Sequence, residues 1–232
     1  MDRGPELLLL HALPLDRSMW TGQMGLLPGA TQAPNLYTLG GDLPAWAASA
    51  LATMRGDRIV VAGCSVGGSC ALEVARLAPE RVAALVLIGT KAEHRPDPEL
   101  HAAALAMLDD GRVDAAWQTF WQPLFSTATP AHVVESARRC ALAQPPSDLA
   151  RGVTAFHTRD SRTDVLAGFG GPIAIVTGAE DTAPGLATSE RQTRMARDGS
   201  LHVIPDCGHY VPLERPGEIN AILRDVIASI AR

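Results

Sequence analysis

The sequence has few lysines, few aromatic residues and no long apolar run, and each scarcity excludes a class of protein. Lys91 is the single lysine among 20 basic residues, which are scattered through a chain of 232 residues with a net charge of −5. Because no cationic face emerges to neutralise phosphates, we expect no nucleic-acid partner. The only strong apolar run near the start, residues 7–10, is far shorter than the ~20 residues of a membrane helix and lacks the flanks of a secretory signal. We therefore expect a cytoplasmic protein that makes no membrane contact.

Metal and cofactor motifs are missing as well. Four cysteines occur without a Cys-x-x-Cys pair, which argues against a disulfide framework and against a zinc site. Neither a His-Glu-x-x-His motif, nor Gly-x-Gly-x-x-Gly, nor a Walker A loop is present. We expect reduced thiols, no metal, and no nucleotide or dinucleotide cofactor.

What is present is a series of short, almost wholly apolar runs that alternate with segments of helical spacing. Runs of this length and β-branched content suit strands that are buried on both faces of a sheet. The runs are 6–11, 58–63, 81–89, 172–178 and 200–205, with a weaker sixth at 32–37. The helical segments are 43–55, 66–78, 187–197 and 214–230. This alternation predicts a three-layer α/β architecture with a parallel sheet.

The alternation stops between residues 91 and 164, where no strand-like run occurs. Glycine and proline punctuation divides this stretch into predicted helices at 97–110, 112–125, 130–143 and 147–157. We predict an α/β core formed by residues 1–90 and 165–232, interrupted by an all-helical insertion at 91–164.

A Gly-x-Ser-x-Gly pattern stands at residues 63–67, after a predicted strand and before a predicted helix. In this setting a serine nucleophile is held on a sharp, strained turn above the sheet edge, with glycines where a Cβ would collide with neighbouring backbone. Ser65 is the candidate nucleophile, and the amide of Val66 at the helix N-terminus is a candidate oxyanion donor. The competing interpretation is a glycine-rich turn without reactivity.

A serine hydroxyl needs a base, and seven histidines compete for that role. His209 follows the last predicted strand, and the C-terminal ends of parallel strands share one sheet edge, so it is placed to meet Ser65. His202 falls within a predicted strand and is expected to be structural. Surface or packing positions are expected for the four histidines of the insertion: His94, His101, His132 and His157.

The base in turn needs a carboxylate to fix its tautomer. Asp181 follows the run 172–178, again at a strand end, which gives the chain order nucleophile, acid, base. Glu180 and Glu93 are alternative acids, and a solvated turn is the non-catalytic interpretation of Asp181.

A second oxyanion donor is expected from the loop after the first strand. Residues 11–14, His-Ala-Leu-Pro, suit this role, with the amide of Leu13 as donor because Pro14 has no N–H. A simple strand exit is the alternative.

With these motifs in order, the sequence resembles the α/β-hydrolase superfamily, in particular its compact cap-bearing esterases, lactonases and carbon–carbon bond hydrolases. The resemblance covers essentially the whole chain and rests on residues 10–20, 63–67, 178–181 and 204–216. It implies a three-layer α/β-hydrolase fold with a mostly parallel sheet, a cap formed by the helical insertion, and acyl transfer to Ser65 followed by attack of water.

The sequence departs from the family pattern at three points. Ala12 stands where the family usually has glycine, and Pro184 precedes the usual position of a proline in the acid loop. The first apolar run begins almost at Met1, so we expect the sheet to lack two N-terminal strands common in the family and to be shortened at the N-terminus. A second copy of the chain is able to cover the edge so exposed, which leaves a homo-oligomer open.

Four of the ten aromatic residues fall within one predicted cap helix, at spacings that place them on one or two adjacent faces: Trp117, Phe120, Trp121 and Phe125. A pocket lined by them would bind a small-molecule substrate with an apolar or aromatic acyl group. The alternative is that the rings dock the cap on the core. Cys64 and Cys207 are expected to be packing residues.

The leading functional hypothesis is a serine hydrolase that cleaves a small carboxylic ester, lactone or thioester through a Ser-His-Asp triad and an acyl-enzyme. The alternative is a triad enzyme of another reaction type: a carbon–carbon bond hydrolase, a cofactor-free perhydrolase or a biosynthetic cyclase. A non-catalytic binding module on the same fold is a third and less favoured hypothesis.

Overall fold

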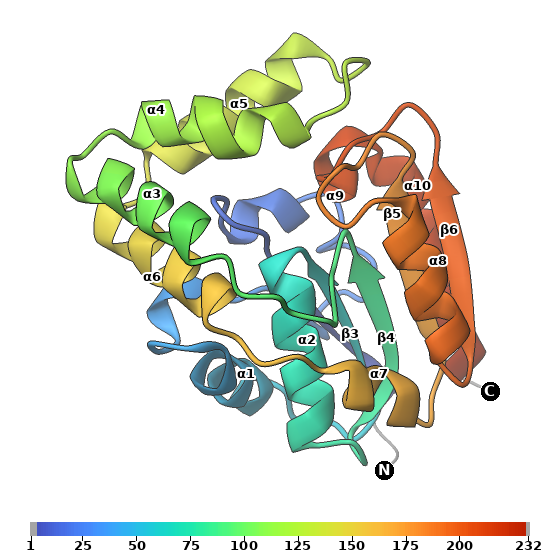
Figure 1. Cartoon of the computed structure of the whole chain (residues 1–232). Coiled ribbons are helices and arrows are strands. Elements are labelled where there is room, and N and C mark those ends of the chain that lie inside the picture. The colour runs from blue at the N-terminus through green and yellow to red at the C-terminus, as the bar shows by residue number, and fades with distance from the viewer. Residues whose placement is uncertain (1–3, 231–232) are drawn as a thin grey trace.

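The computed structural model describes residues 4–230, and its centre is a sheet of six parallel strands in the order β2-β1-β3-β4-β5-β6 (Figure 1). The strands are β1 (Glu6–Leu10), β2 (Thr31–Gln32), β3 (Ile59–Cys64), β4 (Val82–Ile88), β5 (Ile173–Gly178) and β6 (Gly199–Ile204). Because all neighbours are parallel, the loops after every strand meet at one edge of the sheet. The predicted three-layer α/β fold is confirmed.

Helices cover both faces of the sheet. In Figure 1, α2 and α8 lie in front of the strands and α10 lies behind them. The helices outside the β4–β5 connection are α1 (Leu43–Ala52), α2 (Val66–Leu77), α8 (Leu186–Met195), α9 (Val211–Glu214) and α10 (Pro216–Ile230). With both faces covered, every residue of β3 and β5 is buried, which explains their continuous apolar composition.

The connection from β4 to β5 is described throughout and contains helices only. Figure 1 shows α4 and α5 above the C-terminal ends of the strands, and α3 and α6 side by side to the left of them. These helices are α3 (Pro98–Asp109), α4 (Val113–Ala116), α5 (Ala131–Leu142) and α6 (Pro146–His157), and α7 (Thr163–Gly168) follows them. Asp97 begins α3 by accepting a hydrogen bond from the N–H of Leu100 at 3.0 Å. We refer to residues 91–164 as the cap; α7, which the sequence pattern did not predict, starts at its end.

One predicted cap helix is wrong in form. Residues 112–125 do not make a continuous α-helix: α4 is followed by a π-helical turn at Trp117–Trp121 and a 3-10 turn at Gln122–Leu124. Pro123 lacks an N–H and ends the regular helix, and Phe125 is extended. The four aromatic rings therefore do not share one face.

The weak strand predicted at residues 32–37 is also wrong beyond Gln32. Pro34 has no N–H to donate to a sheet, and the N–H of Leu36 donates to Nε2 of His11 at 2.9 Å. A 3-10 turn, Leu36–Thr38, takes the place of the strand. The remaining β2 has two residues and forms one edge of the sheet.

The opposite edge strand, β6, is not buried on both faces as its composition suggested. Ser200 and Val203 are exposed, because no strand lies beyond β6 in the sheet. His202 lies within this strand, as expected.

Candidate active site

The turn between β3 and α2 holds Ser65 in a strained conformation. Its φ is +55° and its ψ is −117°, and its N–H donates to the carbonyl of Ile88 at 2.8 Å. A Cβ at Gly63 or Gly67 would overlap backbone atoms of the turn or of β1. The sharp turn places Ser65 just beyond the edge of the sheet, where it lines a cavity under the cap.

His209 and Asp181 lie at the same edge and form a buried hydrogen-bonded pair. Nδ1 of His209 lies 2.9 Å from Oδ2 of Asp181, and the two residues are 2% and 4% exposed. The second carboxylate oxygen accepts from the N–H of Ala183 at 2.8 Å. In a neutral ring, a proton on Nδ1 serves as the donor to this carboxylate and leaves Nε2 with its lone pair. His209 lines the same cavity as Ser65.

The rival carboxylates are engaged elsewhere. Glu180 accepts from the N–H of Thr127 at 3.2 Å, and Glu93 forms ion pairs with Arg95 and Arg191. Of the three candidate acids, the structure brings only Asp181 to His209.

Sequence reasoning missed Gly89, which follows β4. Its φ is +54°, and a Cβ there would stand 2.8 Å from Nδ1 of His209 and 3.0 Å from Oδ2 of Asp181. Glycine is required both by this conformation and by this close approach. Ile88 pairs with Cys64, so Gly89 lies level with Ser65 at the sheet edge. The corresponding signal in the sequence is a glycine at the end of the apolar run 81–89.

Glu214 is the second missed residue, and its buried carboxylate joins the histidine loop to the cap. It accepts hydrogen bonds from the N–H groups of Gly208 at 3.0 Å, Tyr210 at 2.9 Å and Ser126 at 3.0 Å. The hydroxyl of Thr129 donates to the same carboxylate at 2.5 Å. The backbone on each side of His209 is thus held to residues 126–129 of the cap.

The loop after β1 is fixed by its polar contacts. His11 is fully buried; Nδ1 donates to the carbonyl of Ala12 at 3.1 Å, and burial lowers the pKa of the ring to about 4. The hydroxyls of Tyr210 and Tyr37 donate to the carbonyls of Leu13 at 3.3 Å and Leu15 at 2.8 Å. A cis peptide bond joins Leu13 to Pro14.

The two proposed oxyanion donors belong to different elements at this edge. Leu13 lines the cavity that contains Ser65 and His209. Val66 is the first residue of α2, so its N–H has no acceptor within the helix and stands at the positive end of the helix dipole.

The cavity has a volume of about 290 Å³, and its lining is mainly apolar. Phe120 and Trp121 line it. Trp117 and Phe125 do not: Trp117 is completely buried and donates to the side chain of Gln122 at 3.1 Å, and the ring of Phe125 packs against Tyr210 with centroids 4.6 Å apart. The structure thus divides these four rings into two lining residues and two packing residues, and a fifth aromatic residue of the cap, Phe156, also lines the cavity.

The four cysteines are free thiols. Cys64 and Cys207 are fully buried, and burial raises the pKa of both. In residues 4–230 no cluster of three His, Cys, Asp or Glu side chains is arranged to hold a metal ion. No helix in that range has the length and apolar character needed to cross a bilayer.

Three comparisons with known proteins agree with this architecture. Residues 7–222 match the model of the alpha/beta hydrolase family. A pimeloyl-[acyl-carrier protein] methyl ester esterase from Aromatoleum aromaticum is 30% identical over 247 residues, covering 96% of this chain and 98% of that protein. A protein of the same name from Methylococcus capsulatus is 26% identical, covering 98% and 96%. A thermophilic esterase from Thermogutta terrifontis, solved with malate bound, has a TM-score of 0.87 at 26% identity and covers 100% of this chain and 92% of that one.

Proposed function

The chain belongs to the alpha/beta hydrolase family, and from that premise we propose that it hydrolyses carboxylic esters through Ser65, His209 and Asp181. The observation that carries the proposal is the buried His209–Asp181 pair, which leaves Nε2 of the ring as a base in the cavity that the strained Ser65 lines. The names of the two relatives support an ester, and a methyl ester in particular, as the bond cleaved.

In the first half of the reaction, Nε2 of His209 takes the proton of Ser65 as the hydroxyl oxygen attacks the ester carbon. Asp181 stabilises the imidazolium that results. The N–H groups of Leu13 and Val66 donate to the oxyanion of the tetrahedral intermediate. When the intermediate collapses, the bond to the alcohol oxygen breaks, and the alcohol leaves with the proton from His209.

In the second half, His209 removes a proton from water, and the hydroxide attacks the acyl-enzyme. The bond from the acyl carbon to Ser65 breaks, the serine regains its proton, and the carboxylic acid is released. The apolar lining by residues such as Phe120 and Trp121 suits an apolar segment of the substrate next to the ester.

The test is intact-mass analysis after treatment with a fluorophosphonate, together with hydrolysis of 4-nitrophenyl butyrate. We expect one adduct on Ser65, none on Ser65→Ala, and slow labelling of His209→Ala. Ser69→Ala is the matched control, because Ser69 lies four residues further along the same helix and does not line the cavity; it should label like the wild type. An adduct that persists in Ser65→Ala would refute the proposal.

A further inference from the structure

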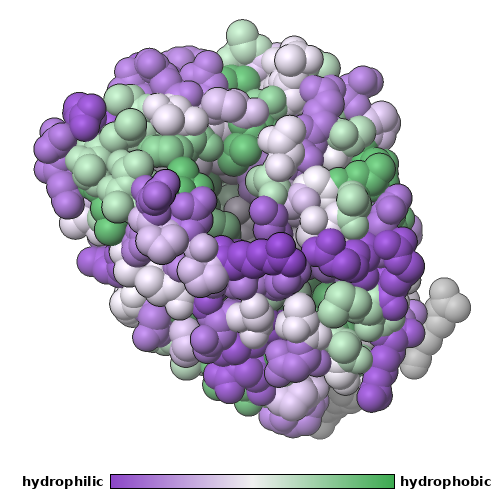
Figure 2. Space-filling view, in the orientation of Figure 1, coloured by the Kyte–Doolittle hydropathy of each residue, from purple (hydrophilic) through white to green (hydrophobic). Residues whose placement is uncertain are grey.

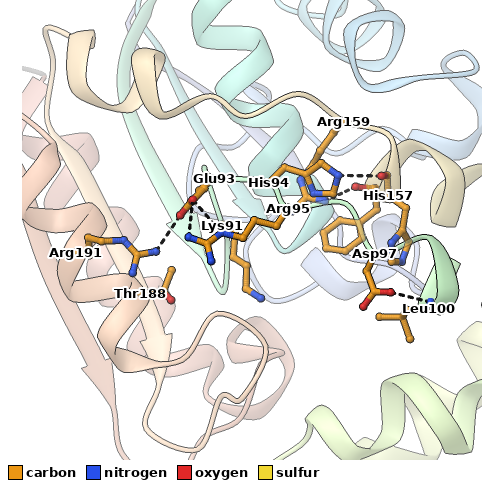
Figure 3. Close-up of a pocket in the computed structure, with 11 residues that line it drawn as sticks. Lys91, Glu93, His94, Arg95, Asp97, Leu100, His157, Arg159, Thr188 and Arg191 are labelled. Carbon is orange, nitrogen blue, oxygen red and sulfur yellow. Dashed lines mark hydrogen bonds and ion pairs between the residues drawn. The ribbon is translucent and has the colours of Figure 1, made fainter.

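A second, charged groove adjoins the catalytic cavity. It has a volume of about 410 Å³ and lies between the loop after β4, the end of α6 and α8 (Figure 3). Its charged lining residues are Lys91, Arg95, Arg159, Arg191, Glu93 and Asp97. Figure 2 shows the corresponding band of hydrophilic residues between the cap and α8, with a hollow above it. Cations thus outnumber carboxylates two to one in this groove, although the net charge of the protein is −5.

Both carboxylates of the groove already have partners. Glu93 forms ion pairs with Arg95 at 3.1 Å and with Arg191 at 3.3 Å, and Asp97 accepts from the N–H of Leu100. Figure 3 shows the two arginine contacts converging on Glu93 and, apart from them, the bond between Asp97 and Leu100. Within residues 4–230, the other two cations of the groove, Lys91 and Arg159, form no ion pair with a carboxylate.

Arg159 is 9% exposed, which is unusual for a guanidinium that has no counter-ion. Its Nη1 donates to the carbonyl of Phe156, and its carbon Cζ lies 3.9 Å from the centroid of the Phe156 ring. Within residues 4–230 no carboxylate forms an ion pair with it, and most of its five N–H donors have no acceptor there. Burial lowers its pKa to about 10, so it remains charged at neutral pH.

Lys91 lines the same groove, and the side chain of Gln192 fixes the backbone around it. The amide of Gln192 donates to the carbonyl of Thr90 at 2.9 Å and accepts from the N–H of Ala92 at 2.6 Å, so the backbone on both sides of Lys91 is fixed. In the described part of the chain, the ammonium group of Lys91 makes no hydrogen bond or ion pair, and it extends freely in Figure 3. Burial, followed by the charge of Arg159, lowers the pKa of Lys91, and the charge of Asp181 opposes this shift.

The groove is continuous with the site of chemistry. Lys91, Leu100, Phe156 and His157 line both the groove and the catalytic cavity. Lys91 also lines a small hollow of about 40 Å³ together with Ser65 and His209. A ligand group at Lys91 would therefore belong to a molecule whose other end reaches the nucleophile.

We propose that this groove binds an anionic group of the ester substrate, a carboxylate or a phosphate monoester, between Lys91 and Arg159 while the ester carbonyl lies at Ser65. The guanidinium supplies a fork of N–H donors to the anionic oxygens, and the ammonium adds a point charge. This inference rests on the proposed ester hydrolysis and adds the charge of the substrate to it.

The kinetic test compares esters that differ in charge alone: monomethyl esters of dicarboxylic acids and methyl esters of monocarboxylic acids of equal chain length. We expect the wild type to prefer the anionic ester in kcat/KM by about tenfold or more, and Lys91→Met and Arg159→Gln each to lower the preference by about tenfold. Lys91→Glu should reverse it. Arg194→Gln removes a charge from an exposed position of α8 outside the groove and should keep the wild-type preference.

Calorimetric titration of Ser65→Ala with hexyl phosphate, hexanoate and hexanol tests the groove without turnover. The two anions should bind more tightly than hexanol, and adding Lys91→Met or Arg159→Lys should remove that difference; the tighter anion identifies the preferred group. Arg159→Lys keeps the charge but loses the fork of donors, and its melting temperature shows whether the variant is folded at the temperature of the titration. Equal binding of all three compounds, with an unchanged kinetic preference in the variants, would overturn the inference. Ester hydrolysis that does not depend on Ser65 would instead overturn the proposed function, while anion binding that depends on Lys91 would still support the groove.

Discussion

Gly89, the residue directly after β4, packs against the imidazole ring of His209. A Cβ at Gly89 would approach Nδ1 of His209 to 2.8 Å, which is too close for a side chain of any kind. The observed position of the His209 ring therefore requires that residue 89, directly after β4, has no side chain.

Gly89→Ala should lower kcat by about a hundredfold, because the methyl group displaces the imidazole by a fraction of an ångström, and should also lower the free energy of unfolding by about 1–2 kcal/mol through backbone strain. Steady-state kinetics and urea denaturation measure the two effects. Gly29→Ala is the control: Gly29 has a φ of +77° and open space around it, so only stability should fall. Equal kinetic losses in both variants would show that strain, and not displacement of His209, is responsible.

The carboxylates at positions 180 and 181 should differ sharply in their effect on turnover. We expect Asp181→Asn to lower kcat by about 10⁴-fold, because the amide no longer fixes the tautomer of the His209 ring. Ser65→Ala and His209→Ala remove the proposed nucleophile and base and should lower kcat by about 10⁴- to 10⁶-fold. Glu180→Gln should change kcat by less than about threefold, since the carboxylate of Glu180 hydrogen-bonds only to the N–H of Thr127 among the described residues. Similar losses for Asp181→Asn and Glu180→Gln would invalidate the assignment of the acid.

The cap aromatics should separate into those that select substrate and those that stabilise the fold. Phe120→Ala enlarges the cavity, so the preferred acyl chain among 4-nitrophenyl esters should become longer. Trp117→Ala removes a completely buried ring, so the free energy of unfolding should fall by about 3–5 kcal/mol while the preferred chain length stays that of the wild type. A changed chain-length profile in Trp117→Ala would place that ring in contact with substrate.

Loss of the Glu214 carboxylate should affect stability and catalysis together. Glu214→Ala leaves buried N–H donors at Ser126, Gly208 and Tyr210 without an acceptor, which should lower the free energy of unfolding by about 3 kcal/mol or more. The histidine loop should also move, so that acylation in a single turnover slows at a temperature where the variant is fully folded. Glu218→Ala is the control, because Glu218 lies four residues further along the chain and is exposed. An unchanged acylation rate would restrict Glu214 to a role in stability.

Burial of His11 should make stability depend on pH. The pKa of His11 is about 4 in the folded protein and 6.5 for the free side chain, so between these values the unfolded chain binds a proton that the folded chain does not. The free energy of unfolding should therefore fall as the pH decreases from about 6.5 towards 4, by on the order of 3 kcal/mol in total. Urea denaturation between pH 4.5 and 7.5 measures the slope, which His11→Gln should reduce and the exposed His132→Gln should not. Identical slopes in the wild type and His11→Gln would contradict this account.

The strands were predictable from sequence because a parallel sheet covered on both faces admits almost no polar side chain. That rule failed where the hydrogen bonds, and not hydrophobicity, decide the structure. At Leu36 the N–H is taken by a histidine 25 residues away, and at Trp117–Trp121 a π turn changes the hydrogen-bond spacing while the aromatic pattern still suggests an α-helix. Neither event leaves a mark in the periodicity of the chain.

The candidate triad was accessible from sequence because each member follows a strand and therefore reaches the same sheet edge. The residues that surround it were not. Glu214 acts through donors 85 to 88 residues away in the cap. Arg159 and Lys91 line one groove because α6, which ends just before Arg159, packs against α3 and α2. Only the packing of the cap on the core creates these neighbours.

The hydrogen bonds of Glu214 also bear on how this enzyme can be recombined with its relatives. A chimera that exchanges the whole of residues 91–164 would replace the segment 126–129, whose Ser126 N–H and Thr129 hydroxyl donate to the resident carboxylate. Crossover points that keep residues 124–129 resident would transfer substrate-facing rings such as Phe120 and preserve both these bonds and the 2.8 Å bond from the N–H of His209 to the carbonyl of Leu124. For this protein the unit of modular exchange is thus smaller than the cap.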